Sequence, residues 1–175
     1  MLRKILGWGL LAGLIVGIPM STMATSMTIG LPSMVIGYLI MLVAFSTVFL
    51  AVKRHRDDEL GGVIRFWPAF AIGLAISFVA SLIYVLAWEF TLAATQMDFA
   101  GKYAAVLIEQ QKAQGTSGEA LAKYVADLER FKADYANPLY RLPMTFTEIF
   151  PVGLLVSLLS AALLRNSRFL PARRA

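Results

Sequence analysis

Twenty-three consecutive residues, from Phe66 to Trp88, carry no charged side chain. At about 1.5 Å per helical residue, this stretch is long enough to cross the roughly 30 Å hydrocarbon core of a bilayer. Pro68 suits the first turn of such a helix, where its missing N–H costs nothing. Trp67 and Trp88 lie near opposite ends, as in the aromatic belts of membrane proteins. We therefore expect a membrane-spanning helix at residues 66–89.

A longer uncharged run, the forty-eight residues from Ile5 to Val52, has room for two crossings. Polar and turn-forming residues interrupt the apolar pattern in the middle of this run and predict a short turn there: Thr22, Thr25, Ser26, Thr28, Gly30 and Pro32. We therefore place helices at residues 5–21 and 32–52.

The first of these helices has an alternative interpretation as a cleaved signal peptide. A basic start and a run of small residues near the end fit that alternative: Arg3, Lys4 and Thr22-Met23-Ala24. However, Gly9, Gly13 and Gly17 recur every fourth residue, which places a smooth strip on one helix face where another helix can approach closely. A signal peptide needs no such strip, so we favour a retained helix.

The last crossing is expected at residues 145–164. Thr145 and Glu148 fit a capping box at its N-terminus. Pro151 falls in the second turn, where it predicts a kink or marks the true beginning of the helix.

Between the third and fourth crossings the composition becomes polar, while apolar residues keep a helical spacing in two successive segments. A Gly-Thr-Ser-Gly sequence at residues 115–118 separates the segments, and Asn137-Pro138 ends the second one. Residues 98–136 therefore predict a helical hairpin outside the bilayer.

Composition agrees with a membrane protein, because 58% of the residues are hydrophobic, 15% are charged and the mean hydropathy is +0.69. We expect an all-α polytopic protein whose residues 1–175 form a single membrane domain, with a bundle of four transmembrane helices and the hairpin between helices three and four. The absence of cysteine excludes disulfides, thiolate metal sites and a cysteine nucleophile. The net charge of +5 does not indicate nucleic acid, because the basic residues flank apolar spans, where they fix topology.

The distribution of charge predicts the orientation of the four crossings. Both termini and the connection after the second helix belong on one side, which holds ten Lys and Arg against three acidic residues. The segment from Glu89 to Glu148 holds six against eight. By the positive-inside rule we expect both termini in the cytoplasm and the hairpin outside.

Two further strips of small residues accompany the first one. The predicted helix-packing residues of all three strips are Gly9, Gly13, Gly17, Gly73, Ser77, Gly153 and Ser157. Packing within one bundle is the expected use of these strips, and association with a second copy or another membrane protein is the alternative.

Three polar residues are candidates for a role at membrane depth: Glu89, Glu148 and Arg141. An ionisable group at such a depth suggests cation coordination, a proton relay or pairing between an acid and Arg141. The structural alternative is that Glu148 caps its helix while Glu89 lies among headgroups, and it explains both acids without a function.

Several short stretches together resemble a bacterial membrane family catalogued as domain of unknown function 4199: residues 59–66, Lys102-Tyr103, residues 129–132, Asn137-Pro138-Leu139-Tyr140 and residues 145–153. The resemblance covers nearly the whole chain, although Arg65 stands where the family often has a small polar residue. It implies a four-pass inner-membrane protein with a retained first helix, and it implies no activity.

Motifs of metallohydrolases, serine hydrolases and NTPases are missing from the sequence. We therefore expect a protein that is not an enzyme and needs no cofactor, and that acts by association with itself or with an envelope complex. The alternative is a small transporter or channel subunit in which Glu89 and Glu148 line a cation or proton path. A third alternative, an envelope enzyme acting on lipid, requires a polar cavity around these acids.

Overall fold

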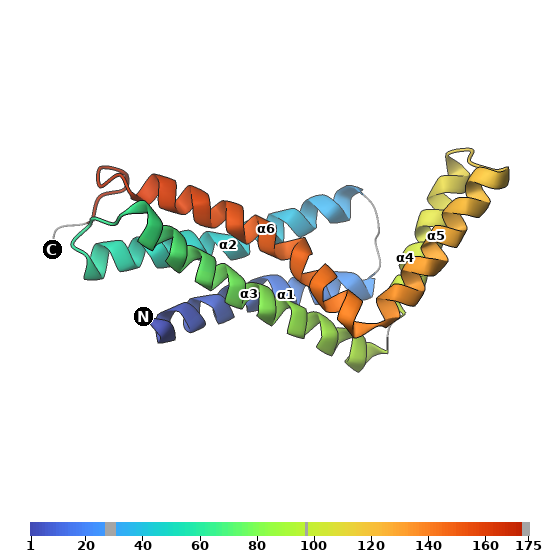
Figure 1. The fold of residues 1–175 in the computed structure, drawn as a ribbon, viewed down its shortest axis with the longest axis horizontal. Helices are drawn as coiled ribbons and strands as arrows, with labels where there is room; N and C mark the ends of the chain where they lie inside the picture. The colour runs from blue at the N-terminus through green and yellow to red at the C-terminus, as the bar shows by residue number, and fades with distance from the viewer. Residues whose placement is uncertain (27–30, 97, 173–175) are drawn as a thin grey trace.

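The computed structural model describes residues 1–26, 31–96 and 98–172, and within them it contains helices and no strands (Figure 1). Six helices follow one another along the chain: α1 (Leu2–Ser26), α2 (Leu31–Glu59), α3 (Phe66–Thr95), α4 (Phe99–Ala113), α5 (Gly118–Ala136) and α6 (Pro138–Leu164). Four of them, α1, α2, α3 and α6, are long and apolar enough to cross a membrane. The predicted all-α fold with four such helices and a helical hairpin is confirmed. The two helices of the hairpin bring the number of described helices to six.

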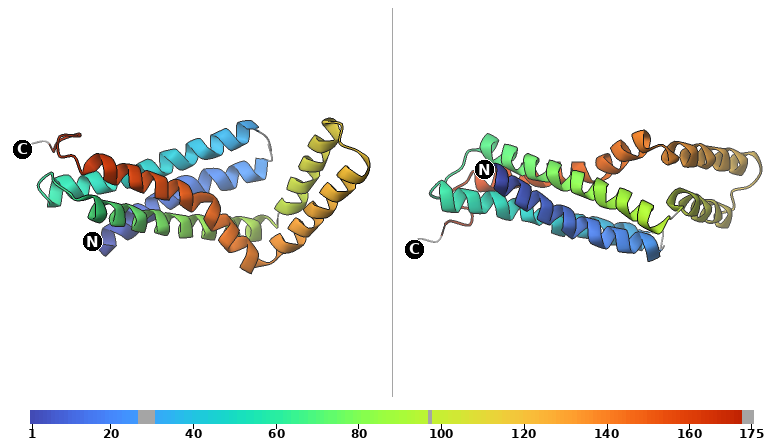
Figure 2. Two further views of the ribbon diagram at one scale, coloured as in Figure 1. Left: turned by 45° about the horizontal axis from the view of Figure 1, so that its top comes forward. Right: turned by 90° about the horizontal axis from the view of Figure 1, so that it is seen from below.

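The four membrane-capable helices pack side by side with alternating direction, and we call them the helical body (Figures 1 and 2). The N-terminus, the connection at residues 60–65 and the segment after α6 lie at one end, which we call the terminal end. The hairpin of α4 and α5 lies beyond the opposite end, which we call the hairpin end. The hairpin slants away from the axis of the body in Figure 1 and in the left view of Figure 2.

Several helix boundaries differ from the expected ones. α1 extends to Ser26 rather than ending near residue 21, and α2 continues through the charged run to Glu59 rather than ending at residue 52. Pairs one turn apart support this extension, because Lys53 Nζ lies 2.5 Å from Asp57 Oδ2. The expected turn residues Thr28 and Gly30 lie outside the described residues, as do Arg173 and Arg174 of the predicted charge pattern.

The prediction that the last helix begins at Thr145 is wrong, because α6 begins at Pro138. The side chain of Asn137 accepts a hydrogen bond from the backbone N–H of Leu139 at 3.0 Å, and Pro138 occupies the first helical position. Thr145 is therefore a buried residue inside the helix rather than its cap. Pro151 also lies inside α6, which bends near its middle in Figure 1.

The glycines of α1 lie against α3 at very short range. A methyl group added at Gly9 would lie 2.5 Å from Val79 Cγ1, and one added at Gly13 would lie 2.5 Å from Ile83 Cβ. At Gly17 the same methyl group would lie 3.1 Å from the Cβ of Ala87. Only a residue without a Cβ allows two helices to approach so closely.

The contact between α3 and α6 is built from small residues of both helices. The hydroxyls of Ser77 and Ser157 lie 3.0 Å apart and are fully buried. A methyl group at Gly73 would lie 3.1 Å from Ser157 Cβ, and one at Gly153 would lie 2.7 Å from the ring of Phe45. Phe45 of α2 is fully buried, so this crossing lies in the centre of the helical body.

The hairpin begins after a break in the chain direction. Gln96 follows α3 in the left-handed conformation, with φ of 48°, and ends that helix. Asp98 then caps α4 by accepting a hydrogen bond from the N–H of Gly101 at 2.7 Å. α3 therefore does not run unbroken into the first arm of the hairpin.

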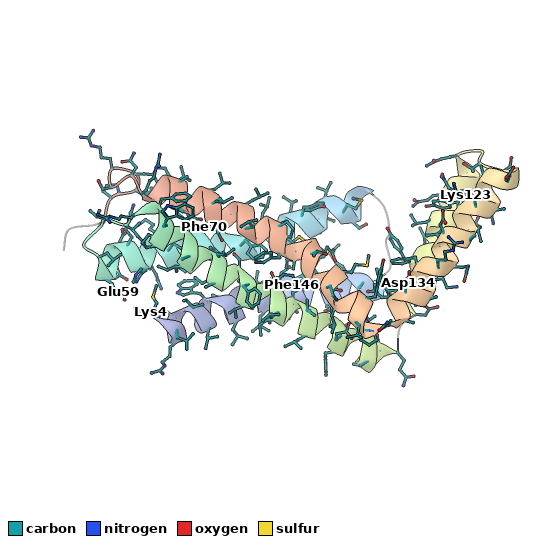
Figure 3. All side chains as sticks on the ribbon, in the orientation of Figure 1. Lys4, Glu59, Phe70, Lys123, Asp134 and Phe146 are labelled. Atoms are coloured by element: carbon teal, nitrogen blue, oxygen red, sulfur yellow. The ribbon has the colours of Figure 1, made fainter. Side chains whose placement is uncertain are left out.

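Side-chain chemistry follows this division of the molecule (Figure 3). The labelled charged residues lie outside the middle of the body, with Lys123 and Asp134 on the hairpin and Lys4 with Glu59 at the terminal end. Exposed large apolar side chains cover the body between them, such as Leu86, which is 63% exposed, and Leu155, which is 60% exposed. Exposed apolar surface on membrane-capable helices is what a lipid environment requires.

Candidate functional site

The end of α3 and the beginning of α6 meet through an ion pair at the hairpin end. Arg141 donates from Nε to Glu89 Oε1 at 2.6 Å and from Nη2 to Glu89 Oε2 at 2.5 Å. The two side chains are only 14% and 26% exposed. This two-pronged geometry is the strongest form of contact between arginine and a carboxylate. The structure thus brings two of the three polar candidates together.

Tyr135, near the end of α5, ties the hairpin to this ion pair. Its backbone carbonyl accepts a hydrogen bond from Arg141 Nη1 at 3.0 Å, and its ring lies under the guanidinium, 5.6 Å from ring centroid to Cζ. Its hydroxyl accepts a hydrogen bond from Trp88 Nε1 at 2.7 Å. Burial raises the pKa of Tyr135 to about 12, so the phenol stays neutral at physiological pH.

Aromatic rings extend the contact to α4. The ring centroids of Trp88 and Phe99 are 5.0 Å apart, and those of Phe99 and Tyr135 are 5.8 Å apart. Phe131 of α5 packs on Tyr135 with centroids 5.4 Å apart. All four helices that meet here, α3, α4, α5 and α6, therefore contribute to one cluster. We call it the joint, and it consists of Trp88, Glu89, Phe99, Phe131, Tyr135 and Arg141.

A cavity of about 180 Å³ adjoins the joint between the hairpin and the start of α6. Asp98 and Lys132 contribute its other charged groups. Asp98 already accepts the capping hydrogen bond from Gly101, and Glu89 is held by Arg141. Both acids therefore make contacts at the base of the hairpin.

Glu148 is separate from the joint. It lies two turns after Arg141 on α6 and is exposed. Within the described part of the chain it forms no ion pair and no hydrogen bond. The expected capping role is wrong, because α6 begins ten residues earlier, at Pro138.

The predicted helix-packing residues all lie between helices of this chain. Gly9, Gly13 and Gly17 face α3, while Gly73, Ser77, Gly153 and Ser157 form the crossing of α3 with α6. These strips are already covered within one copy of the protein.

Sequence reasoning missed Arg56, which is fully buried at the terminal end. Its Nε donates to Asp57 Oδ1 at 2.6 Å, while Nη1 and Nη2 donate to the backbone carbonyls of Phe169 and Leu170 at 2.9 and 2.6 Å. The segment after α6 is therefore clasped to the end of α2. In the sequence, Arg56 lies within a run of charged residues. Such a run is expected beside a membrane span, so nothing distinguishes Arg56 from its neighbours.

Tyr135 and Phe99 were also not identified as joint residues. A signal existed, because Phe99 with Tyr103 and Phe131 with Tyr135 place aromatic pairs one turn apart on both arms of the hairpin. That pattern indicates an aromatic seam, but it does not indicate which residue of the helical body the seam contacts.

The described residues contain no group of three or more His, Cys, Asp or Glu side chains that could hold a metal ion. Searches of curated proteins and of solved structures found no match to this chain. A family model described as protein of unknown function (DUF4199) matches residues 7–166, which include the whole helical body except its first few residues, and the joint. The chain therefore belongs to the DUF4199 family.

Proposed function

We propose that this protein is a non-enzymatic membrane protein that presents the hairpin of α4 and α5 to a partner at the outer face of a bacterial inner membrane. The observation that carries the proposal is the joint. An ion pair with two hydrogen bonds, a phenol–indole hydrogen bond and stacked rings fix the base of the hairpin to the helical body. A preorganised element of this kind loses little conformational freedom when it binds.

The outward surface of the hairpin supports a polar and reversible interaction. Exposed charges of both signs are interspersed along α5: Glu119, Lys123, Asp127, Glu129, Arg130 and Asp134. Pairs within the helix, such as Lys132 with Glu129 at 3.0 Å, are exposed and weakly held. A partner with complementary charges can therefore replace them.

Self-association through the small-residue strips receives less support. α3 already fills the strip of α1, and the serines of α3 and α6 already face each other. The hairpin and the lipid-exposed flank of the body remain as surfaces for a second copy or for another membrane protein.

Charge supports the proposed orientation. In the sequence, ten Lys and Arg and three acidic residues lie before Phe66 or after Leu164, whereas six basic and eight acidic residues lie from Glu89 to Glu148. The terminal end therefore faces the cytoplasm by the positive-inside rule.

Site-specific photocrosslinking in native membranes tests the proposal. A photoreactive residue at Lys123 or Arg130 should give a discrete adduct of defined mass, because both positions are exposed on α5 and neither belongs to the joint. The same residue at Leu86, which is 63% exposed on the body, serves as a matched control. The adduct should disappear when Arg141→Ala loosens the joint. Adducts of equal yield at Leu86, or an adduct indifferent to Arg141→Ala, would contradict the proposal.

The transporter alternative has one observation in its favour, the exposed carboxylate of Glu148 on a membrane-capable helix. Glu89 favours it less, because Arg141 neutralises its charge. Proton or cation flux into liposomes containing the protein should depend on Glu148→Gln if this alternative is correct. Flux that is absent, or unchanged by the substitution, removes it.

A further inference from the structure

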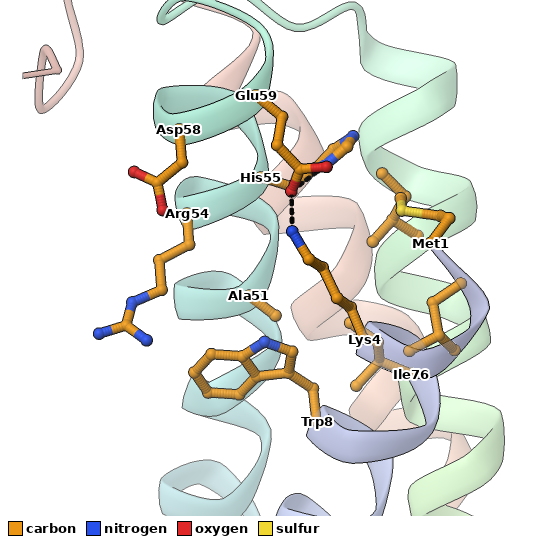
Figure 4. A pocket seen from close by; sticks show the side chains of 11 residues that line it. Met1, Lys4, Trp8, Ala51, Arg54, His55, Asp58, Glu59 and Ile76 are labelled. Carbon is orange, nitrogen blue, oxygen red and sulfur yellow. Dashed lines mark hydrogen bonds and ion pairs between the residues drawn. The ribbon is translucent and has the colours of Figure 1, made fainter.

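A second cavity, of about 190 Å³, opens at the terminal end between α1, α2 and α3 (Figure 4). Its rim carries charged side chains from the start of α1 and the end of α2: Lys4, Arg54, His55, Asp58 and Glu59. Its floor is apolar and consists of Ile5, Trp8, Ala51, Ile72 and Ile76. The cavity therefore changes from charged to apolar along the axis of the body.

The charged side chains of the rim form few ion pairs with one another. Lys4 pairs with Glu59, but these side chains are 58% and 38% exposed, and exposed pairs are easily exchanged. Arg54 contacts the ring of Trp8, 5.7 Å from the centroid, and neither Arg54 nor Asp58 has an ion-pair partner among the residues described. The buried Nδ1 of His55 lies 3.1 Å from Glu59 Oε1 without making a hydrogen bond.

The rim holds two permanent cations, Lys4 and Arg54, and two carboxylates, Asp58 and Glu59. A ligand with charge of one sign would meet repulsion from half of this set. A ligand with one anionic and one cationic group would satisfy it. The guanidinium of Arg54 suits a phosphate, because its N–H groups match two phosphate oxygens. A carboxylate suits a primary ammonium group, which donates hydrogen bonds.

The volume and the position of the cavity further restrict the class of ligand that it can bind. Pockets that enclose a whole small molecule usually hold about 300–1,000 Å³, so this cavity accommodates a headgroup rather than a complete amphiphile. It lies where the apolar stretches of α1 and α2 end, which is the depth of lipid headgroups if these helices cross a membrane. The apolar floor then continues into the region of the acyl chains.

We propose that this cavity binds the headgroup of a glycerophospholipid that carries a phosphodiester and a primary ammonium group, as phosphatidylethanolamine does. Arg54 and Lys4 hold the phosphate, Asp58 and Glu59 hold the ammonium group, and the first acyl carbons lie along Ile5 and Ile72. This site goes beyond the proposed function, because it lies at the opposite end from the hairpin and does not require a protein partner.

Native mass spectrometry of the delipidated full chain in mild detergent tests the proposal. Phosphatidylethanolamine, phosphatidylglycerol and phosphatidylcholine with identical acyl chains are offered together. We expect phosphatidylethanolamine to be retained about tenfold better than either competitor, since a hydrogen bond to a charged group is worth about that factor. Water-soluble glycerophosphoethanolamine should not displace the bound lipid at equal concentration.

Matched variants assign the binding to the cavity. Arg54→Gln should weaken retention of phosphatidylethanolamine about tenfold, whereas Arg168→Gln, which removes the same charge from an exposed position at the same end, should not. Asp58→Lys should shift the preference towards phosphatidylglycerol. Helical content and gel-filtration volume check that each variant is folded.

Equal retention of the three lipids by the unmodified protein would overturn the proposal without recourse to any variant. So would an Arg168→Gln variant that is weakened as much as Arg54→Gln. Displacement of the bound lipid by glycerophosphoethanolamine at equal concentration would mean that the apolar floor does not contribute to binding. The ligand would then not need to be a lipid.

Discussion

An ion pair joins two helices at each end of the helical body, and the two pairs differ in how far they are buried and in how many contacts they make. At the hairpin end Arg141 and Glu89 are 14% and 26% exposed and are held by two parallel hydrogen bonds. At the terminal end Lys4 and Glu59 are 58% and 38% exposed and share one contact. The first pair is supported by Tyr135 and its ring contacts, whereas the second stands at the mouth of a cavity.

Burial, and not only the presence of opposite charges, decides how much an ion pair stabilises the protein. An exposed pair contributes about 0–1 kcal/mol, because water and salt compete for both charges. Removing one partner of a buried pair costs about 3–5 kcal/mol, because the other charge stays without water or partner. The joint is therefore a structural fastening, and the Lys4–Glu59 pair is free to exchange partners.

Arg56 lies at the terminal end like Lys4, but it is fully buried. Arg56→Ala should lower the free energy of unfolding by about 3 kcal/mol, since two backbone carbonyls lose their donor and Asp57 keeps only its contact with Lys53. Unfolding by added dodecyl sulfate, followed by circular dichroism in detergent, measures the change. Arg168→Ala is the control, and an equal loss in both variants would mean that position rather than burial matters.

Arg141→Ala should cost about 2 kcal/mol in the same measurement, less than Arg56 because the pair with Glu89 is partly exposed. The change should also loosen the hairpin, so limited proteolysis should cut first near Gln96, where α3 ends. If Glu89→Gln with Arg141→Gln destabilises the protein as much as Arg141→Ala alone, then the contact matters through packing rather than charge.

Tyr135→Phe keeps the ring contacts of the joint and removes the acceptor of the Trp88 hydrogen bond. We expect a loss of about 1 kcal/mol, the net value of one hydrogen bond. The fluorescence of Trp88 should also shift when the indole N–H loses its partner. Tyr140→Phe, on the exposed side of α6, is the matched control, because Tyr140 is 44% exposed. Equal losses of stability in the two variants would mean that the hydrogen bond between Trp88 and Tyr135 does not stabilise the joint.

Lys4→Gln should have the smallest effect, below about 0.5 kcal/mol, as for other exposed pairs. Raising the salt concentration should reduce even that difference. A loss of stability as large as that of Arg141→Ala would show that the Lys4–Glu59 pair also holds its helices together.

The four membrane-capable helices were predictable because their signal is local. Uncharged runs long enough to cross a bilayer have few other uses, and regular spacing of Gly9, Gly13 and Gly17 indicates a close helix contact. The sequence also indicates the hairpin, since its apolar spacing differs from that of a lipid-exposed helix. Which helix faces each small strip becomes clear from the structure, where α3 fills the strip of α1.

The start of α6 was missed because Arg141 and Pro143 make residues 138–144 look like a loop. In the structure, the cap by Asn137 and the contacts of Arg141 with Glu89 stabilise a helix there. The joint was only partly foreseen for a related reason. Trp88 and Tyr135 are 47 residues apart, and no local pattern specifies their contact. Pairing between Glu89 and Arg141 was one of several hypotheses that the sequence left open.

The hydrogen bonds of Arg56 to the segment after α6 go to the main chain, while the ring of Phe169 packs on Phe49. Arg56 binds the carbonyl oxygens of Phe169 and Leu170, which every amino acid possesses. Leu170 is 50% exposed and has a φ of 47°, a geometry that glycine adopts more easily. A substitution at Leu170 therefore keeps the carbonyl oxygen that Arg56 binds. Related proteins can differ in sequence at this position and still hold the segment after α6 in the same way.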